Sequence, residues 1–214
     1  RWLSRFPTID QQLSRRLLDA EGPSLTRTGR MQRLVARAAG DRFALLPFAA
    51  GFISPLQSTG IAHTLTSVER LARAFESPAL PSSDFLARCC AATRSELRFI
   101  DDLISLCYET TSRPELFHLA TMTYFAAVTT YEKQRSEQGD ALQADFLGAH
   151  DQRLRAALSR AAEQIRAAAA SAWNADNLRD LQSSLKQTLR DYDHVGLFDP
   201  AIPRMHPHTA APEF

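Results

Sequence analysis

The sequence predicts a mainly α-helical protein with a small β portion near its start. From residue 58 onward, apolar side chains recur at three- and four-residue intervals over long stretches, which is typical of amphipathic helices. Alternation of polar and apolar residues occurs convincingly only before that point, in LTRTGRMQRLVAR (25–37) and RFALLPF (42–48). We therefore expect two sheet strands followed by a helical domain over residues 58–192.

The helices can be placed from their apolar stripes and their end signals. A short helix over residues 8–18 should end at Gly22-Pro23, and Ser82 or Ser83 is suited to cap the longest helix. The stripes of the second, fourth and fifth long helices should pack on one another. The expected long helices cover residues 58–75, 82–107, 114–131, 148–172 and 174–192.

The two ends of the chain differ from this helical part. Residues 1–57 carry the two strands, and residues 193–214 form a proline-rich C-terminal extension, in which each proline favours an extended conformation at the preceding residue. The chain does not begin with Met, so we expect a processed chain or a piece of a longer one.

Composition narrows the possible partners. Of the 214 residues, 44% are hydrophobic and 23% charged, which is the balance of a globular protein. A formal net charge of +1 argues against a general nucleic-acid binder, and no apolar run approaches the roughly 20 residues that cross a bilayer. Three cysteines, of which Cys89 and Cys90 are adjacent, favour a reducing, cytoplasmic location.

The segment LLPFAAGFISPLQSTGIAHTL (45–65) is the best candidate for a ligand site. A turn at Ser58, Thr59 and Gly60 leads into a helix expected to begin near Ile61, whose first amides lack partners within the helix. A glycine there lets a flat or anionic group approach the backbone, and the helix dipole favours negative charge. A plain strand, turn and capped helix with nothing bound is the alternative.

This segment resembles the flavin-dependent halogenase-like oxidoreductases, whose FAD-contacting block reads approximately Gly-Phe-x-x-Pro-Leu-x-Ser-Thr-Gly before a long helix. The run GLFDPAIPRMHP is similar to a second feature of that family, a Gly-Leu-x-Asp-Pro turn followed by an aromatic-Pro pair, with His206 in place of the aromatic residue. The matching residues are Gly51, Phe52, Pro55, Leu56, Ser58, Thr59 and Gly60 in the first block, and Gly196, Leu197, Asp199, Pro200 and Pro207 in the second.

The resemblance implies that the first block binds FAD, with backbone groups around Ser58, Thr59 and Gly60 beside the flavin. It also implies a helical cover over an aromatic small-molecule substrate, in an oxidoreductase or monooxygenase. The aromatic row of residues 117–131, which includes Tyr124 and Tyr131, is either a wall of that pocket or core packing, and core packing is the better interpretation.

Departures from the family pattern limit what the chain can do alone. Gln57 stands where tryptophan halogenases carry a catalytic Glu, Ser54 replaces a common acid, and Phe48 replaces an Asp that binds the cofactor in many FAD oxidoreductases. The dinucleotide fingerprint Gly-x-Gly-x-x-Gly is absent from the 214 residues, and the family's required lysine belongs to the same absent half.

We therefore predict the helical C-terminal region of an FAD-dependent oxidoreductase that lacks its Rossmann-type N-terminal half. FAD should bind only when that FAD-binding half is present as a partner, and the chain alone should be catalytically silent. Residues 1–57 would then be a remnant of the flavin and substrate domain. The alternative is a helical interaction or structural module with no cofactor.

Other candidate sites are weaker. Asp193, His194, Asp199, His206 and His208 fit no compact zinc spacing, so no metal site is predicted. Their proline-rich surroundings would also hold ligands poorly.

Among the remaining candidates, Cys89 and Cys90 suit a core better than a redox pair. The adjacent Asp101 and Asp102 suit a solvated helix face rather than a catalytic carboxylate pair. His63 lies one turn into the helix after the Ser-Thr-Gly turn, close enough to face a ligand.

Overall fold

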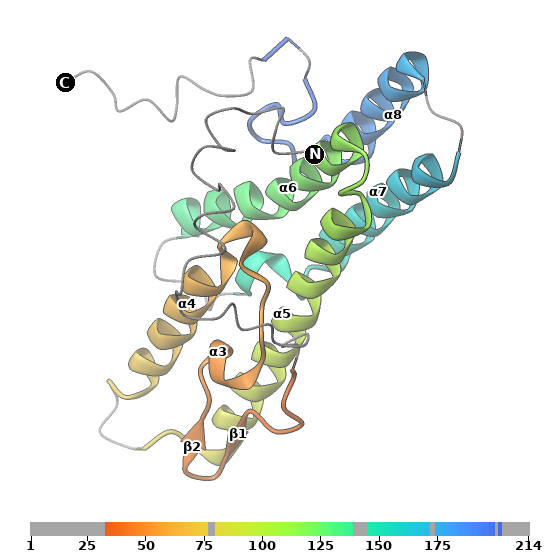
Figure 1. Cartoon of the computed structure of the whole chain (residues 1–214). Helices are drawn as coiled ribbons and strands as arrows, with labels where there is room; N and C mark the ends of the chain where they lie inside the picture. Colours follow the sequence, from red (N-terminus) through yellow and green to blue (C-terminus); the bar gives the residue numbers. More distant parts are fainter. Residues whose placement is uncertain (1–32, 77–79, 139–144, 172–173, 200, 203–214) are drawn as a thin grey trace, which may run out of the picture. The chain divides into compact units, whose positions relative to one another are not determined.

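Helices dominate the computed structural model of the chain, as the sequence predicts (Figure 1). The structure describes residues 33–76, 80–138, 145–171, 174–199 and 201–202, all within one compact unit that spans residues 32–214. The five main helices are α4 (Thr59–Ala74), α5 (Ser83–Glu109), α6 (Pro114–Gln138), α7 (Gln152–Ala170) and α8 (Ala175–Thr188).

The starts of these helices follow from their sequences. Ser82 caps α5 by accepting a hydrogen bond from the backbone N–H of Phe85 at 3.2 Å, as expected. Asp151 caps α7, Asn174 caps α8, and Pro114 occupies the first position of α6, where its missing N–H costs nothing. All five long helices are confirmed, although α6 extends beyond the predicted end at residue 131. The short helix predicted over residues 8–18 lies outside the described residues.

The core forms where neighbouring helices bury their apolar stripes. In chain order, α5 packs on α6, α6 on α7 and α7 on α8. Ile100 and Ile104 of α5, Leu158 of α7 and Leu185 of α8 are fully buried in one cluster, and each contributes roughly 1.5–3 kcal/mol of hydrophobic stabilisation. Tyr124 and Tyr131 lie in the same cluster, while Phe117, Met122 and Phe125 pack against it, so the aromatic row of α6 is core packing.

The β portion is smaller than predicted. It consists of β1 (Ala39–Gly40) and β2 (Phe43–Ala44), paired antiparallel in the register Ala39↔Ala44 and Gly40↔Phe43, and the hairpin packs on α5. The strand predicted over residues 42–48 is wrong beyond Ala44, because Pro47 begins the short helix α3 (Pro47–Ala50). Proline fixes φ and lacks the N–H that a strand ladder needs.

The first predicted strand, over residues 25–37, forms no ladder within the described residues. Residues 25–32 of that strand lie outside the described residues, and from residue 33 onward only an isolated bridge between Leu34 and Gly51 forms. The N–H of Val35 donates to the carbonyl of Ala50 at 2.8 Å, and the N–H of Phe52 donates to the carbonyl of Arg33 at 2.9 Å. This early segment therefore holds the start of the candidate ligand segment in place.

The chain after α8 turns back onto the core. Residues 197–198 and 201 lie in turns, so the described part of this segment is not the extended run expected, and Phe198 is buried in the core. The Asp193 carboxylate organises this region by accepting hydrogen bonds from the N–H groups of Leu197 at 2.6 Å and Phe198 at 3.3 Å. Gly196 has a φ of 74°, a conformation that glycine adopts without strain. Residues 203–214 lie outside the described residues.

Candidate functional site

The candidate ligand segment folds as a tight turn that opens directly into α4. Residues Pro55–Gln57 form a single 3-10 turn, η2. The Ser54 hydroxyl caps this turn by accepting a hydrogen bond from the N–H of Leu56 at 3.4 Å. Ser58 follows with φ 54° and ψ 21°, a left-handed conformation that costs a non-glycine residue roughly 1–3 kcal/mol. The helix then begins at Thr59, two residues before the expected start near Ile61.

Side chains of α5 and α6 anchor this turn. The Ser54 hydroxyl lies 2.8 Å from the Tyr108 hydroxyl, and the Gln57 side-chain amide donates weakly to the Cys107 sulfur at 4.0 Å. Thr59 makes a short hydrogen bond with the hydroxyl of Tyr124. The conformation of residues 54–59 is therefore set by the helical region behind it.

The seven residues predicted to contact FAD divide into an outer and an inner group. Pro55 and Ser58 are exposed, and Phe52 and Leu56 are half-buried. The remaining three, Gly51, Thr59 and Gly60, are buried.

The buried glycines are needed because other groups come close to them. A methyl group at Gly51 would lie 2.8 Å from the side chain of Leu97, so glycine is required for packing there. At Gly60 a methyl group would collide with the tip of the Phe48 ring.

Phe48 covers the glycine at the start of α4. Its ring is 45% exposed, and its carbonyl accepts a hydrogen bond from the Arg33 guanidinium at 2.9 Å. The group closest to Gly60 is thus a half-exposed side chain that can rotate away, rather than fixed backbone.

The outward surface of α4 is apolar. Ile61 and Leu65 are 68% and 63% exposed, and Val68 continues the same face at helical spacing. We call these three residues together with Phe48 the α3–α4 apolar face. Leu34 and Phe43, from the segments before it, are exposed as well. An exposed patch of this kind is typical of a surface that another protein segment covers.

The inward surface of α4 is polar instead. His63 and Glu96 have no exposed side-chain surface, and His63 Nε2 lies 2.8 Å from Glu96 Oε2. Arg70 donates to Glu96 Oε1 at 2.7 Å, and the backbone N–H of Phe146, in the 3-10 turn η4 (Phe146–Gly148), donates to the same oxygen at 3.1 Å. His63 stacks on the Phe146 ring with centroids 4.8 Å apart. This network joins α4, α5 and η4.

Glu96 keeps its charge in this buried setting. Burial alone would raise its pKa, but hydrogen bonds from His63 and Arg70 outweigh burial, so the pKa lies below the ordinary value for Glu. His63 faces this network and not a ligand, contrary to the expectation from its position one turn into the helix. Sequence reasoning missed Glu96, although its spacing from Ile100, Leu103 and Cys107 places it on the buried stripe of α5.

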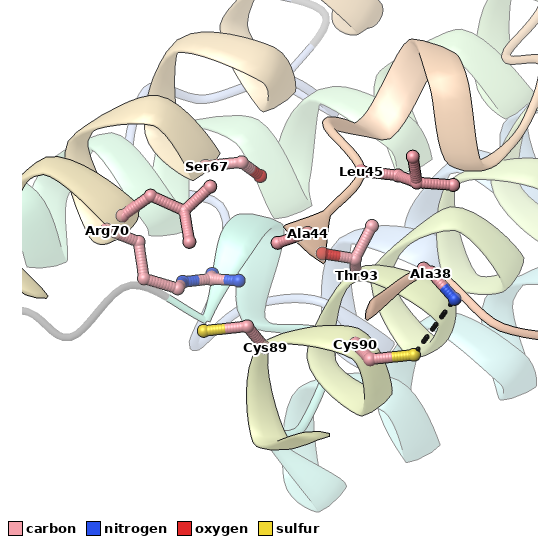
Figure 2. Close-up of a pocket in the computed structure, with 9 residues that line it drawn as sticks. Ala38, Ala44, Leu45, Ser67, Arg70, Cys89, Cys90 and Thr93 are labelled. Atoms are coloured by element: carbon pink, nitrogen blue, oxygen red, sulfur yellow. Dashed lines mark hydrogen bonds between the residues drawn. The ribbon is translucent and has the colours of Figure 1, made fainter. Parts of the chain in front are cut away.

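A small cavity lies between α4, α5 and the hairpin (Figure 2). Ser67 and Arg70 approach it from α4, Cys89 and Thr93 from α5, and Leu45 from the segment after the hairpin. Its volume of about 10 Å³ admits roughly one water molecule. The cavity is therefore far too small for a flavin or an aromatic substrate.

The three cysteines behave as core residues. All are free thiols; Cys89 and Cys107 are buried, and the Cys90 sulfur accepts the N–H of Ala38 at 3.1 Å. Burial raises the pKa of the Cys89 and Cys107 thiols, which keeps them protonated at neutral pH and poorly nucleophilic.

No metal cluster or membrane-spanning helix is evident in the part of the chain that the structure describes. Within the described ranges, His, Cys, Asp and Glu side chains form no group of three that could hold a metal ion. None of the helices in these ranges is both long and apolar enough to cross a membrane.

The features at the start of α4 fit a flat or anionic group such as the flavin end of FAD. The helix starts without a side-chain cap at Ser58, so no side chain competes for its first N–H groups. The dipole of α4 favours negative charge at this end. The atoms nearest to Gly60 belong to the Phe48 side chain, not to fixed backbone.

In sequence, the chain is similar to halogenases. Residues 11–179 match the family model described as tryptophan halogenase. The tetracycline 7-halogenase of Kitasatospora aureofaciens is 38% identical over 69 residues, which are 32% of this chain and 12% of that protein.

Solved structures of the halogenase PltM share the fold of this chain. A PltM variant in complex with FAD superposes with a TM-score of 0.62 at 20% identity, covering 92% of this chain and 44% of PltM. PltM in complex with phloroglucinol and FAD gives a TM-score of 0.61 at 19% identity and covers 43% of PltM. The chain thus spans less than half the length of these structures.

Proposed function

The chain belongs to the tryptophan halogenase family, and we propose that it is the C-terminal helical part of an FAD-dependent, halogenase-like oxidoreductase. In this proposal residues 1–57 are a remnant of the flavin and substrate domain, residues 58–192 cover the substrate, and residues 193–214 form an extension. The N-terminal half that carries the dinucleotide-binding motif is the chain's partner. The match to less than half of PltM supports this division.

The α3–α4 apolar face is the observation that carries the proposal. Ile61, Leu65 and Val68 point away from the core of the described residues, although the chain forms a well-packed core elsewhere. Burying such side chains removes an unfavourable water contact worth roughly 25 cal/mol per Å². A partner that covers this face, and with it the start of α4, explains the exposed surface and the position of the predicted flavin segment together.

The exposed edge of the turn would hold the cofactor. Pro55, Leu56 and Ser58 would contact it directly, while Phe52, Gly51, Thr59 and Gly60 would shape the turn behind them. The first N–H groups of α4 would face the flavin, and Phe48 would turn aside from Gly60. FAD, when bound, supplies the redox chemistry of a monooxygenase-type reaction.

The chain's own residues would orient and enclose the site. Ser58, in its left-handed conformation, joins η2 to α4, and the hydrogen bonds with Tyr108, Cys107 and Tyr124 would hold residues 54–59 in place for the cofactor. Gln57 offers an amide and no carboxylate, so this position cannot accept a proton as a Glu would.

We propose an aromatic small molecule as the substrate class and the cytoplasm as the location. PltM has been solved with phloroglucinol, a small aromatic compound, which supports the first proposal. Three free cysteines, two of them adjacent in α5, support a reducing compartment.

The test is to purify the chain alone and together with the N-terminal half, and to titrate both samples with FAD while recording visible absorption. We expect the chain alone to stay colourless and the pair to bind FAD. Leu65→Asp should weaken association of the two halves at least about tenfold, because it charges the centre of the apolar face. Val195→Asp, which alters an exposed apolar residue after α8, is the matched control and should leave association unchanged.

Two results would contradict the proposal. A pair that remains colourless at saturating FAD would point to a helical interaction module without cofactor. Equal association of Leu65→Asp and Val195→Asp with the N-terminal half would show that the α3–α4 apolar face is not the contact surface.

A further inference from the structure

Two tyrosines of α6 form matching hydrogen bonds with two threonines of α4. The Tyr124 hydroxyl bonds to Thr59, and the Tyr131 hydroxyl lies 3.2 Å from Thr66 Oγ1. The two threonines are seven residues apart in α4, and the two tyrosines are seven residues apart in α6, so two turns of α4 are matched to two turns of α6. All four side chains are buried.

The Thr59 hydroxyl also reaches the turn that precedes α4. Thr59 Oγ1 lies 3.5 Å from the backbone carbonyl of Gln57, which can only accept. The Thr59 hydroxyl therefore links the Tyr124 hydroxyl of α6 to the backbone of η2.

Tyr124 is suited to keep this hydrogen bond over a wide pH range. Burial raises the pKa of its phenol above the ordinary value, and the hydrogen bond with Thr59 offsets part of that rise. The phenol therefore stays protonated at neutral and moderately alkaline pH.

We infer that Tyr124 is a positioning residue for the proposed flavin site: through Thr59 it fixes the start of α4, whose first N–H groups would face the cofactor. The inference rests on the proposed function. Tyr131 makes the same kind of bond two turns further along, where it only fastens α4 to α6. It also accepts a hydrogen bond from Arg135 at 3.3 Å, so its removal should destabilise the fold at least as much.

Comparing variants of Tyr124 and Tyr131 distinguishes a positioning role from simple core packing. If both tyrosines serve only as core residues, their Phe variants should differ in no property other than stability. If Tyr124 sets the geometry of the turn, only its variant should alter cofactor binding, because hydrogen bonds remote from the turn do not orient its amides.

The experiment compares Tyr124→Phe with Tyr131→Phe in the full chain. Amide hydrogen exchange of the chain alone should accelerate about fivefold at Ser58, whose N–H donates to the Pro55 carbonyl at 2.9 Å, in Tyr124→Phe, the loss of one buried hydrogen bond, and remain unchanged there in Tyr131→Phe. With the N-terminal half present, the Kd for FAD should rise about fivefold in Tyr124→Phe and change less than twofold in Tyr131→Phe. Thr59→Val, which removes the Thr59 hydroxyl at nearly constant size, replaces Tyr124→Phe if the latter does not fold.

The outcomes separate the inference from the proposed function. Equal exchange and equal FAD affinity in the two Phe variants would overturn the inference and leave the proposed function intact. A wild-type pair that does not bind FAD would overturn the proposed function and the flavin role of Tyr124 together. Faster exchange at Ser58 with unchanged FAD affinity would also overturn the inference.

Discussion

Replacing Glu96 by Gln should destabilise the chain strongly, because it removes the negative charge at the centre of a buried network. Glu96 accepts hydrogen bonds from Arg70 and from the N–H of Phe146, and it pairs with His63. Gln preserves the size of the side chain. It removes the negative charge that Glu96 places 2.7 Å from the Arg70 guanidinium, which is only 15% exposed.

The expected loss can be estimated from this geometry. Breaking a buried ion pair by removing one partner costs about 3–5 kcal/mol. Because part of Arg70 still reaches solvent, we expect the lower end, about 3 kcal/mol in the free energy of unfolding. A loss of that size lowers the Tm of a chain of this length by about 6–12 °C.

The pH dependence of this loss follows from the direction of the pKa shift. The folded-state pKa of Glu96 lies below the ordinary Glu value of about 4.3, so its charge contributes fully above that pH. The contribution is lost as pH falls below that value through the folded pKa. The difference between wild type and Glu96→Gln should therefore be constant from pH 7 to pH 5 and shrink below about pH 4.

Urea unfolding at pH 7, 5 and 3.5, followed by circular dichroism, measures this effect. Glu69→Gln is the matched control, since Glu69 pairs with Arg73 and Arg135 at the surface and should contribute less than about 1 kcal/mol. A loss below about 1 kcal/mol for Glu96→Gln at pH 7, or a difference that does not depend on pH, would refute the reasoning.

Two further substitutions test the turn before α7 by the same urea assay. Gly148→Ala should lower the free energy of unfolding by about 1–3 kcal/mol, because Gly148 has a φ of 71° and the new methyl group would lie 2.6 Å from the Leu154 side chain. A loss under about 0.5 kcal/mol, roughly the noise of the assay, would contradict this reasoning. Asp151→Ala should cost about 1 kcal/mol, since its carboxylate accepts the N–H groups of Arg153 and Leu154 at 2.8 and 3.1 Å, and Asp151→Asn should retain most of the stability. Equal losses for Ala and Asn at position 151 would show that the cap does not act through this hydrogen bond.

Much of the helical architecture could be predicted from local signals. Ser82 fixed the start of α5, and the stripe through Ile100 and Ile104 identified its buried face, because both depend on residues close in sequence. The β portion was harder to predict from the sequence. Apolar runs of five to seven residues occur in strands and in short helices alike, and Pro47 favours the short helix α3 over a strand.

The candidate site was located by motif but not by geometry. Gly51, Ser58 and Gly60 marked the segment, whereas its anchors Tyr108 and Tyr124 lie more than 50 residues away in sequence and gave no local signal. The rotation of Phe48 onto Gly60 likewise depends on the packing of α3 against α4.

The orientation of α4 is consistent with the partner that we propose for its apolar residues. Hydrophobic periodicity alone would turn Ile61, Leu65 and Val68 inward, yet the structure buries the polar side, with His63 and Thr66, and exposes the apolar one. On this polar side, Glu96 of α5 bonds to His63 Nε2 and Tyr131 of α6 bonds to Thr66. Among the described residues, His63 Nδ1, Thr64 Oγ1 and Ser67 Oγ are buried without a hydrogen-bond partner, so the polar side of α4 is only partly satisfied. A helix with a buried polar side and an exposed apolar side is suited to lie between two layers of protein. The second layer, in our proposal, is the half that binds FAD.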